Sequence, residues 1–261
     1  MSTESNTKHA VVLLHPFPFD SRIWREVQEK LTDCGYLVLA PNFRGCGNVE
    51  LGAQQPDLEL LGQDMWNLLD LEGISNPIVI GISLGGYVAM SMLRQRPLGI
   101  AGLGLVDTKA SADSMDARTT RLAIAENMNS QTAVTDLTTA MLPRLLSEFT
   151  QNHRAKQSQE VLTWMQEASA TTIAWLQRAM AHRPSSLAQL AKFAGPVLLL
   201  RGSEDQVCSA QDYADMSAVL PSAQYLEIPN TAHLPPIEDP EATATAILNW
   251  LQFACSQLSS R

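Results

Sequence analysis

Basic side chains are scarce in this sequence. Its 261 residues include 18 Lys and Arg against 27 Asp and Glu, which gives a formal net charge of −9 and a sequence pI near 5.0. Proteins that bind nucleic acid or anionic membranes present basic patches, and this balance argues against both kinds of partner. Charged residues make up 17% of the chain and hydrophobic residues 45%, a composition that excludes disordered and collagen-like classes. We expect a globular protein whose partner is a small molecule.

Cysteine is also rare. The four cysteines are far apart and form neither a C-x-x-C pair nor the spacing of a zinc site, so we expect no metal. Reduced thiols are the simplest interpretation, and a disulfide pair stays open. The four are Cys34, Cys46, Cys208 and Cys255.

Long apolar runs are absent. The longest unbroken runs, such as residues 10–14, fall far short of the ~20 residues that a membrane helix needs. The first ten residues, MSTESNTKHA, are polar and lack the basic start and apolar stretch of a secretory signal. We therefore expect a cytoplasmic protein that does not bind membranes. No sequence feature indicates an oligomeric state.

Six short runs rich in Val, Ile and Leu recur along the chain. Because they are continuously apolar rather than alternating, they are typical of parallel strands that are buried on both faces. The sequence predicts an α/β fold with about six mainly parallel strands and helices on both faces of the sheet. The carboxyl ends of such strands share one edge, where a site is expected. The predicted strands are 10–14, 37–40, 77–81, 100–106, 196–200 and 224–228.

Residues 108–192 contain no strand-like run. A loop of that length without secondary structure does not suit a compact domain. Spacings such as Leu137, Met141 and Leu145 are helical. We therefore predict a helical cap inserted between the fourth and fifth strands. The α/β core would then comprise residues 1–107 and 193–261.

Five of the ten methionines lie in this predicted cap. Methionine adapts to irregular apolar surfaces, so some of these side chains are candidates for lining an apolar pocket. The simpler interpretation places them in a small core of the cap's own. The candidate pocket residues are Met128, Met141, Trp164 and Met165.

Gly81-Ile82-Ser83-Leu84-Gly85 matches G-x-S-x-G between a predicted strand and a helix that runs from Ser83 to about Arg94. A serine on such a tight turn has a strained backbone, and glycines two residues before and after it let strand and helix approach closely. The turn presents the serine hydroxyl at the sheet edge, beside the free N–H groups of the helix N-terminus. Ser83 is therefore the candidate nucleophile.

A serine hydroxyl needs a base, and the base needs a carboxylate that orients it. His233 follows the sixth predicted strand at the same sheet edge and is the preferred base among five histidines. Asp205 follows the fifth strand and is the preferred acid, with Glu204 second and Asp107 a distant third. The chain order Ser83, Asp205, His233 is that of nucleophile-elbow hydrolases.

These motifs resemble the α/β-hydrolase-fold serine hydrolases, in particular small carboxylesterases and enol-lactonase-like proteins. The resemblance runs from about residue 9 to residue 252. It implies an α/β-hydrolase fold in which the inserted helices form the cap. The segments that carry it are Gly81–Gly85, Gly202–Asp205, His233–Pro240, His15–Pro18, Pro41–Gly47 and Asp107–Asp113.

The resemblance also implies an oxyanion hole formed by the backbone N–H groups of Phe17 and Leu84. Pro16 replaces the glycine that usually follows the histidine of this loop, but the family's donor is the next residue. Asn42 replaces the usual aspartate, which we expect to weaken a structural contact rather than the chemistry. The first predicted strand starts near residue 10, where the family often has two further strands upstream, so we expect a sheet of about six strands.

The resemblance implies hydrolysis of carboxylic esters or lactones through an acyl-enzyme intermediate, with no metal or organic cofactor. Two alternatives stay open: a biosynthetic cyclase or acyltransferase that uses the same triad, and a ligand-sensing protein with little turnover. Dehalogenases and epoxide hydrolases of this fold use an aspartate nucleophile, which Ser83 disfavours. Leu234 disfavours hydroxynitrile lyases, which typically have lysine there, and Leu84 disfavours perhydrolases, which tend to have methionine.

Overall fold

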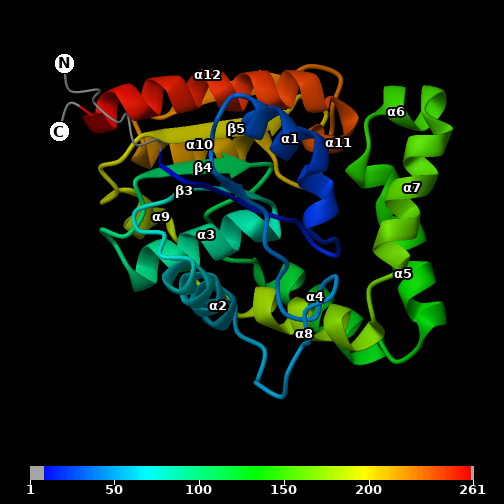
Figure 1. The fold of residues 1–261 in the computed structure, drawn as a ribbon. Coiled ribbons are helices and arrows are strands. Elements are labelled where there is room, and N and C mark those ends of the chain that lie inside the picture. Colours follow the sequence, from blue (N-terminus) through cyan, green and yellow to red (C-terminus); the bar gives the residue numbers. More distant parts are fainter. Residues whose placement is uncertain (1–8, 260–261) are drawn as a thin grey trace.

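A computed structural model describes residues 9–259, and the predicted six-stranded parallel sheet is confirmed (Figure 1). The strand order is β2-β1-β3-β4-β5-β6, and every neighbouring pair is parallel. The prediction about a secretory signal rests on residues 1–10. Residues 1–8 of this segment lie outside the described residues. The strands are β1 Val11–Leu14, β2 Val38–Leu39, β3 Ile78–Ile82, β4 Gly102–Val106, β5 Val197–Gly202 and β6 Gln224–Ile228.

Helices cover both faces of the sheet because its central strands are apolar on both sides. In β1, Val11 and Leu13 pack with α1 and α12, whereas Val12 and Leu14 pack with α2, α3 and α10. The helix α2 was not among the helices that we predict from the sequence. The core helices are η1 Ser21–Trp24, α1 Arg25–Asp33, α2 Leu58–Leu71, α3 Leu84–Gln95, α9 Leu187–Leu190, α10 Ala210–Val219, α11 Pro235–Glu238 and α12 Pro240–Ser259.

The helical insertion between β4 and β5 is also observed. Its helices are α4 Met115–Asn127, α5 Gln131–Leu145, α6 Glu148–His153, α7 Ala155–Gln166 and α8 Ala170–Ala181. Serine side chains begin four of them by accepting a backbone N–H from the first turn, which satisfies one otherwise unpaired donor. These N-cap serines are Ser114, Ser130, Ser147 and Ser169.

The inserted helices do not form a separate core. Buried side chains of α8, such as Ile173 and Leu176, belong to the same apolar cluster as those of α2 and α3. Val161 and Met165 of α7 join the cluster on the opposite face of the sheet. The short helix α9 also lies between β4 and β5, within the predicted cap range 108–192, but it packs against the core helices α3 and α10. The cap is therefore held by both halves of the main core.

Polar contacts fix α8 to the long loop between β2 and α2. The Trp175 indole donates to the Gln54 carbonyl at 2.8 Å, and the Thr172 hydroxyl donates to the Gly45 carbonyl at 3.0 Å. These bonds orient the cap helix over the sheet edge that carries the site.

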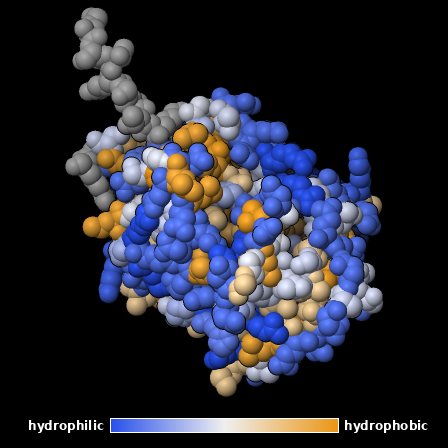
Figure 2. Space-filling view, turned by 60° about the horizontal axis from the view of Figure 1, so that its bottom comes forward, coloured by the Kyte–Doolittle hydropathy of each residue, from blue (hydrophilic) through white to orange (hydrophobic). Residues whose placement is uncertain are grey.

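Hydrophilic side chains predominate on the face shown in Figure 2, with hydrophobic residues scattered among them. Scattered apolar residues are normal on a protein surface and indicate no docking site. Within residues 9–259, no helix combines the length and the apolar character that a membrane span requires.

Candidate active site

Ser83 lies on the turn that joins β3 to α3. Its backbone has φ 52° and ψ −114°, a conformation that side chains other than glycine rarely adopt. Two hydrogen bonds hold it there: Ser83 N–H donates to the Val106 carbonyl at 3.0 Å, and the Thr108 hydroxyl donates to the Ser83 carbonyl at 2.8 Å. The strained turn is thus fixed by β4 and the residues that follow it.

The flanking glycines are required by backbone contacts. A Cβ atom at Gly81 would lie 2.2 Å from the Gly85 carbonyl oxygen, and one at Gly85 would lie 2.1 Å from the Leu14 carbonyl oxygen. Both distances are far shorter than any real Cβ contact, and the opposing atoms are backbone that cannot rotate away. The G-x-S-x-G spacing is therefore a packing requirement of this turn.

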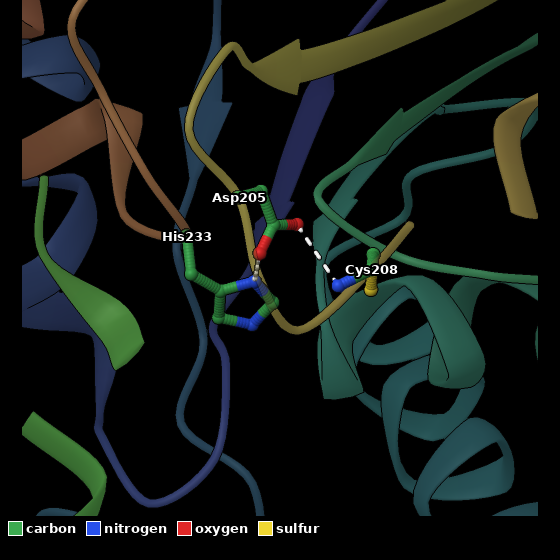
Figure 3. Close-up of side chains that lie close together, drawn as sticks. All are labelled: Asp205, Cys208 and His233. Carbon is green, nitrogen blue, oxygen red and sulfur yellow. Dashed lines mark hydrogen bonds and ion pairs between the residues drawn. The ribbon is translucent and has the colours of Figure 1, made fainter. Parts of the chain in front are cut away.

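His233 and Asp205 form a buried hydrogen-bonded pair (Figure 3). His233 Nδ1 lies 3.0 Å from Asp205 Oδ1, and the residues are 2% and 4% exposed. The second imidazole nitrogen points away from the carboxylate. A carboxylate on Nδ1 favours the tautomer in which Nε2 accepts a proton, the state that a general base requires.

Backbone donors complete the setting of Asp205. Its carboxylate accepts from Val207 N–H at 2.8 Å and from Cys208 N–H at 3.2 Å. Burial raises the pKa of Asp205, but the His233 charge and hydrogen bond, with the Val207 N–H, outweigh burial and leave it below the usual value. Asp205 is therefore ionised at neutral pH, as the orienting acid of a triad must be.

The other two acid candidates are engaged elsewhere. Glu204 accepts the Glu148 N–H at 3.1 Å, so its carboxylate faces the cap. Asp107 is buried, accepts the Gly202 N–H at 2.9 Å, and its second oxygen has no hydrogen-bond partner within the described residues. Burial and the charge of Asp205 raise the pKa of Asp107 well above its usual value, which disfavours its charged form.

Ser83, His233 and Phe17 line one cavity of about 450 Å³ beneath the cap. Its volume lies within the range of small-molecule sites. The cap side is formed by α4, α5 and α8, and the walls combine apolar residues, such as Met141, with charged ones. The walls are mainly apolar, as expected, but the expectation did not include the charged side chains, which are Lys109, Asp113, Arg121 and Arg144.

Of the four predicted pocket residues, the structure places Met141 alone at this cavity, and the other three lie elsewhere. Met128 lines a separate groove between α4 and α5, and Trp164 lines a second cavity beside Arg22. Met165 is fully buried in the main core. The physical reason is that α7, which carries Trp164 and Met165, packs against α5 and α6 rather than over Ser83.

The two residues predicted to form an oxyanion hole lie at the start of α3 and in the loop after β1. Leu84 is the first residue of α3, so its N–H has no helical acceptor. Phe17 lies in the loop after β1 and lines the cavity. His15 shapes that loop: its Nδ1 pairs with the Pro16 carbonyl at 3.0 Å, and its Nε2 accepts the Phe43 N–H at 3.1 Å.

Asp205, Cys208 and His233 are also the one group of described residues with the spacing of a metal site, since their potential ligand atoms lie within 4.8 Å of one another. Two observations favour the triad interpretation. Both Asp205 oxygens are occupied by N–H donors, and Cys208 Sγ donates to the Asp107 carbonyl at 3.3 Å. Burial raises the pKa of the Cys208 thiol well above its usual value, which disfavours the thiolate that binds metals.

Glu238 is a residue whose role the sequence analysis missed. Its buried carboxylate accepts the Ala232 N–H at 2.6 Å and the Ser147 N–H at 2.7 Å. It therefore ties the loop that carries His233 to the start of α6 in the cap. The sequence feature that could have indicated this role is the position of Glu238 in the segment 233–240, which contributes to the family resemblance.

A parallel sheet with a strained serine after its third strand, and an Asp-paired histidine that lines the same cavity as this serine, is typical of nucleophile-elbow α/β proteins. The sequence matches the family model of the alpha/beta hydrolase fold over residues 9–240. The chain belongs to this family.

Individual relatives agree with this assignment. A thermophilic esterase from Thermogutta terrifontis, solved with malate bound, is 30% identical; the match covers 94% of this chain and 90% of that one, with a TM-score of 0.90. The 3-oxoadipate enol-lactonase 1 of Acinetobacter baylyi is 24% identical over 89% of this chain and 84% of its own length. An epoxide hydrolase from Caballeronia sordidicola is 32% identical over 98 residues, which are 30% of that protein's length.

Gly85→Ala tests the packing of the turn. We expect loss of the native turn, with a fall in unfolding free energy of about 3 kcal/mol or more, because the new methyl group meets the Leu14 carbonyl. Gly102→Ala is the matched control, since a Cβ there lies 3.4 Å from its nearest neighbours. Urea unfolding of both variants measures the difference; equal stabilities would contradict the packing argument.

The buried side chain of His15 is expected to make the stability of the protein depend on pH. Burial lowers its pKa from 6.5 to about 4, although the Pro16 hydrogen bond opposes the shift. The unfolded chain therefore takes up a proton that the folded protein refuses, and stability present above pH 6.5 is lost as the pH falls towards 4. Between pH 8 and pH 5 the loss from this residue is about 2 kcal/mol.

His15→Asn removes this titration while all other groups remain. We expect the variant to be less stable than wild type at pH 8, with the gap narrowing by about 2 kcal/mol at pH 5. Urea unfolding at the two pH values measures the gap. A gap that stays constant would show that His15 titrates normally in the folded protein.

Proposed function

We propose that this protein is a serine hydrolase that cleaves carboxylic esters or lactones through an acyl-enzyme intermediate. The observation that carries the proposal is the shared cavity of Ser83, on its strained turn, and His233, which is paired at 3.0 Å with the ionised Asp205. Family membership and the esterase and enol-lactonase relatives support a hydrolase. The triad and the acyl-enzyme go beyond that support.

In the proposed first step, His233 Nε2 removes the proton from the Ser83 hydroxyl as the oxygen attacks the substrate carbonyl. Asp205 stabilises the imidazolium that forms, and its hydrogen bond to Nδ1 keeps the ring in place. The tetrahedral intermediate collapses when His233 returns the proton to the departing alkoxide. The acyl group is then esterified to Ser83.

The oxygen that becomes negative in this step needs hydrogen-bond donors. Phe17 N–H and Leu84 N–H supply them in the proposal, and the positive end of α3 adds to the field. In the second step, water attacks the acyl-enzyme with His233 as base, and Ser83 is released. For a lactone, the alkoxide and the acyl group belong to one molecule, so the product is a hydroxy acid.

Ser83→Ala tests the nucleophile. We expect wild type to hydrolyse short aryl esters and to be labelled by a fluorophosphonate probe, and the variant to lose both, with kcat lower by roughly 10⁶-fold. Ser256→Ala, on the exposed part of α12, is the control that retains labelling. The measurements are release of the aryl alcohol and the mass of the labelled protein.

Two results would overturn the proposal in different ways. Equal absence of labelling and turnover in wild type and Ser83→Ala, on esters and lactones alike, would favour a ligand-sensing protein. Labelling of Ser83 with transfer of the acyl group to an acceptor other than water, or ring closure, would favour an acyltransferase or cyclase.

Asp205→Asn tests the choice of acid. Asparagine preserves the size of the side chain but stabilises the wrong imidazole tautomer, so we expect kcat to fall by roughly 10⁴-fold. Glu204→Gln is the matched control, because the Glu204 carboxylate faces Glu148 in the cap, and we expect a change of a few-fold at most. Ester hydrolysis at pH 8 measures both; the reverse ranking would make Glu204 the acid.

A further inference from the structure

The cavity that holds Ser83 is lined by positive charge, although the whole chain carries a net charge of −9. Lys109, Arg121 and Arg144 line it together with one carboxylate, that of Asp113. In a partly enclosed site such charges act across a lower dielectric than in water and attract anions strongly. The question is which of the three cations is free to bind a ligand.

The contacts of Asp113 show which of these cations are already paired. Its carboxylate accepts from Arg121 Nε at 2.6 Å and lies 2.8 Å from Arg183 Nη2, and the side chains of Asp113 and Arg183 are 2% and 3% exposed. Burial raises the pKa of Asp113, but the Arg183 hydrogen bond and the two guanidinium charges outweigh it, and the pKa falls below the usual value. Asp113 is thus an ion that its two arginines neutralise.

Lys109 is the most loosely held cation of this network. Its Nζ lies 4.0 Å from Asp113 Oδ1, which is the outer limit of an ion pair and beyond hydrogen-bonding distance. Arg121, by contrast, also contacts Gln177 Oε1 at 3.1 Å, and Arg144 is exposed, where water screens it. The Lys109 side chain is only 22% exposed, so its ammonium group keeps unused donors inside the cavity wall.

The position of Lys109 relates it to the reaction. It follows Thr108, whose hydroxyl donates to the Ser83 carbonyl, so this hydrogen bond ties the residue next to Lys109 to the backbone of the nucleophile. Apolar side chains that include Ile124, Leu137 and Met180 line the same cavity. The cavity therefore combines apolar walls with a partly buried cation, which suits an aliphatic chain that carries a carboxylate.

We propose that Lys109 is a specificity-determining residue that binds a carboxylate of the substrate, so that the preferred substrates are esters or lactones with a free carboxylate separated from the reacting carbonyl by a short aliphatic chain. This inference rests on the proposed ester or lactone hydrolysis at Ser83. It adds the chemical class of the substrate. A charge-assisted hydrogen bond to a lysine inside a cavity is the interaction that selects it.

The test compares two substrates of equal length. 4-Nitrophenyl hydrogen adipate carries a terminal carboxylate, and 4-nitrophenyl hexanoate carries a methyl group in its place. We expect wild-type kcat/KM to be roughly tenfold or more higher for the charged ester. In Lys109→Met this ratio should fall to about one, and in Lys109→Arg it should be largely retained, since the charge remains.

Lys192→Met is the matched control, because Lys192 is exposed after α9 and does not line the cavity. It removes the same charge from the chain, so an unchanged ratio in this variant excludes a general electrostatic effect. Thermal unfolding of each variant verifies that it is folded. If Lys109→Met does not fold, Lys109→Gln takes its place in the comparison of the two esters.

A binding measurement separates this inference from the proposed function. Ser83→Ala protein is titrated with adipate by calorimetry, with and without Lys109→Met, and we expect the second substitution to weaken binding roughly tenfold. Hydrolysis of both esters at equal kcat/KM by wild type would overturn the inference and leave the hydrolase proposal standing. Lys109-dependent adipate binding without hydrolysis of either ester would do the opposite.

Discussion

The structure depends on a close backbone contact between the end of β1 and the start of α3. Gly85 approaches the Leu14 carbonyl so closely that a Cβ atom would lie 2.1 Å from it, and Gly81 packs equally closely on Gly85. This contact places the helix N-terminus at the sheet edge and the loop after β1 beside it. As a result, the start of α3 and the loop after β1 become neighbours, although they are far apart in the sequence: a Cβ atom at Gly85 would also lie 3.0 Å from the His15 carbonyl oxygen.

A second contact of the same kind positions the base. A Cβ atom at Gly202 would lie 1.9 Å from the Ala232 carbonyl oxygen, so the turn after β5 and the loop after β6 pack backbone against backbone. Glu204 N–H donates to the Thr231 carbonyl at 2.9 Å, and Glu238 fixes Ala232 from the other side. Asp205 and His233 lie within hydrogen-bonding distance because these contacts hold the two loops together.

The sequence predicts the features that follow from local chemistry. Apolar runs predict the strands, although β6 is not continuously apolar and the middle three of its residues are exposed. The flanking glycines predict a tight turn at Ser83 with its strained backbone. The pocket wall was not predictable in the same way, since helical spacing does not say which face of an inserted helix meets the sheet. Met141 on α5 therefore lines the cavity, whereas Met165 on α7 joins the main core. The buried ion pair of Asp113 with Arg183 joins residues 70 positions apart, and no local pattern in the sequence marks it.

The most direct test of the account is to trap the covalent intermediate. Wild-type protein is mixed with excess 4-nitrophenyl hexanoate, quenched in acid during turnover, digested and examined by mass spectrometry. We expect a hexanoyl group on the peptide that contains Ser83. Turnover without any acylated peptide, or acylation at another residue such as Cys208, would contradict it.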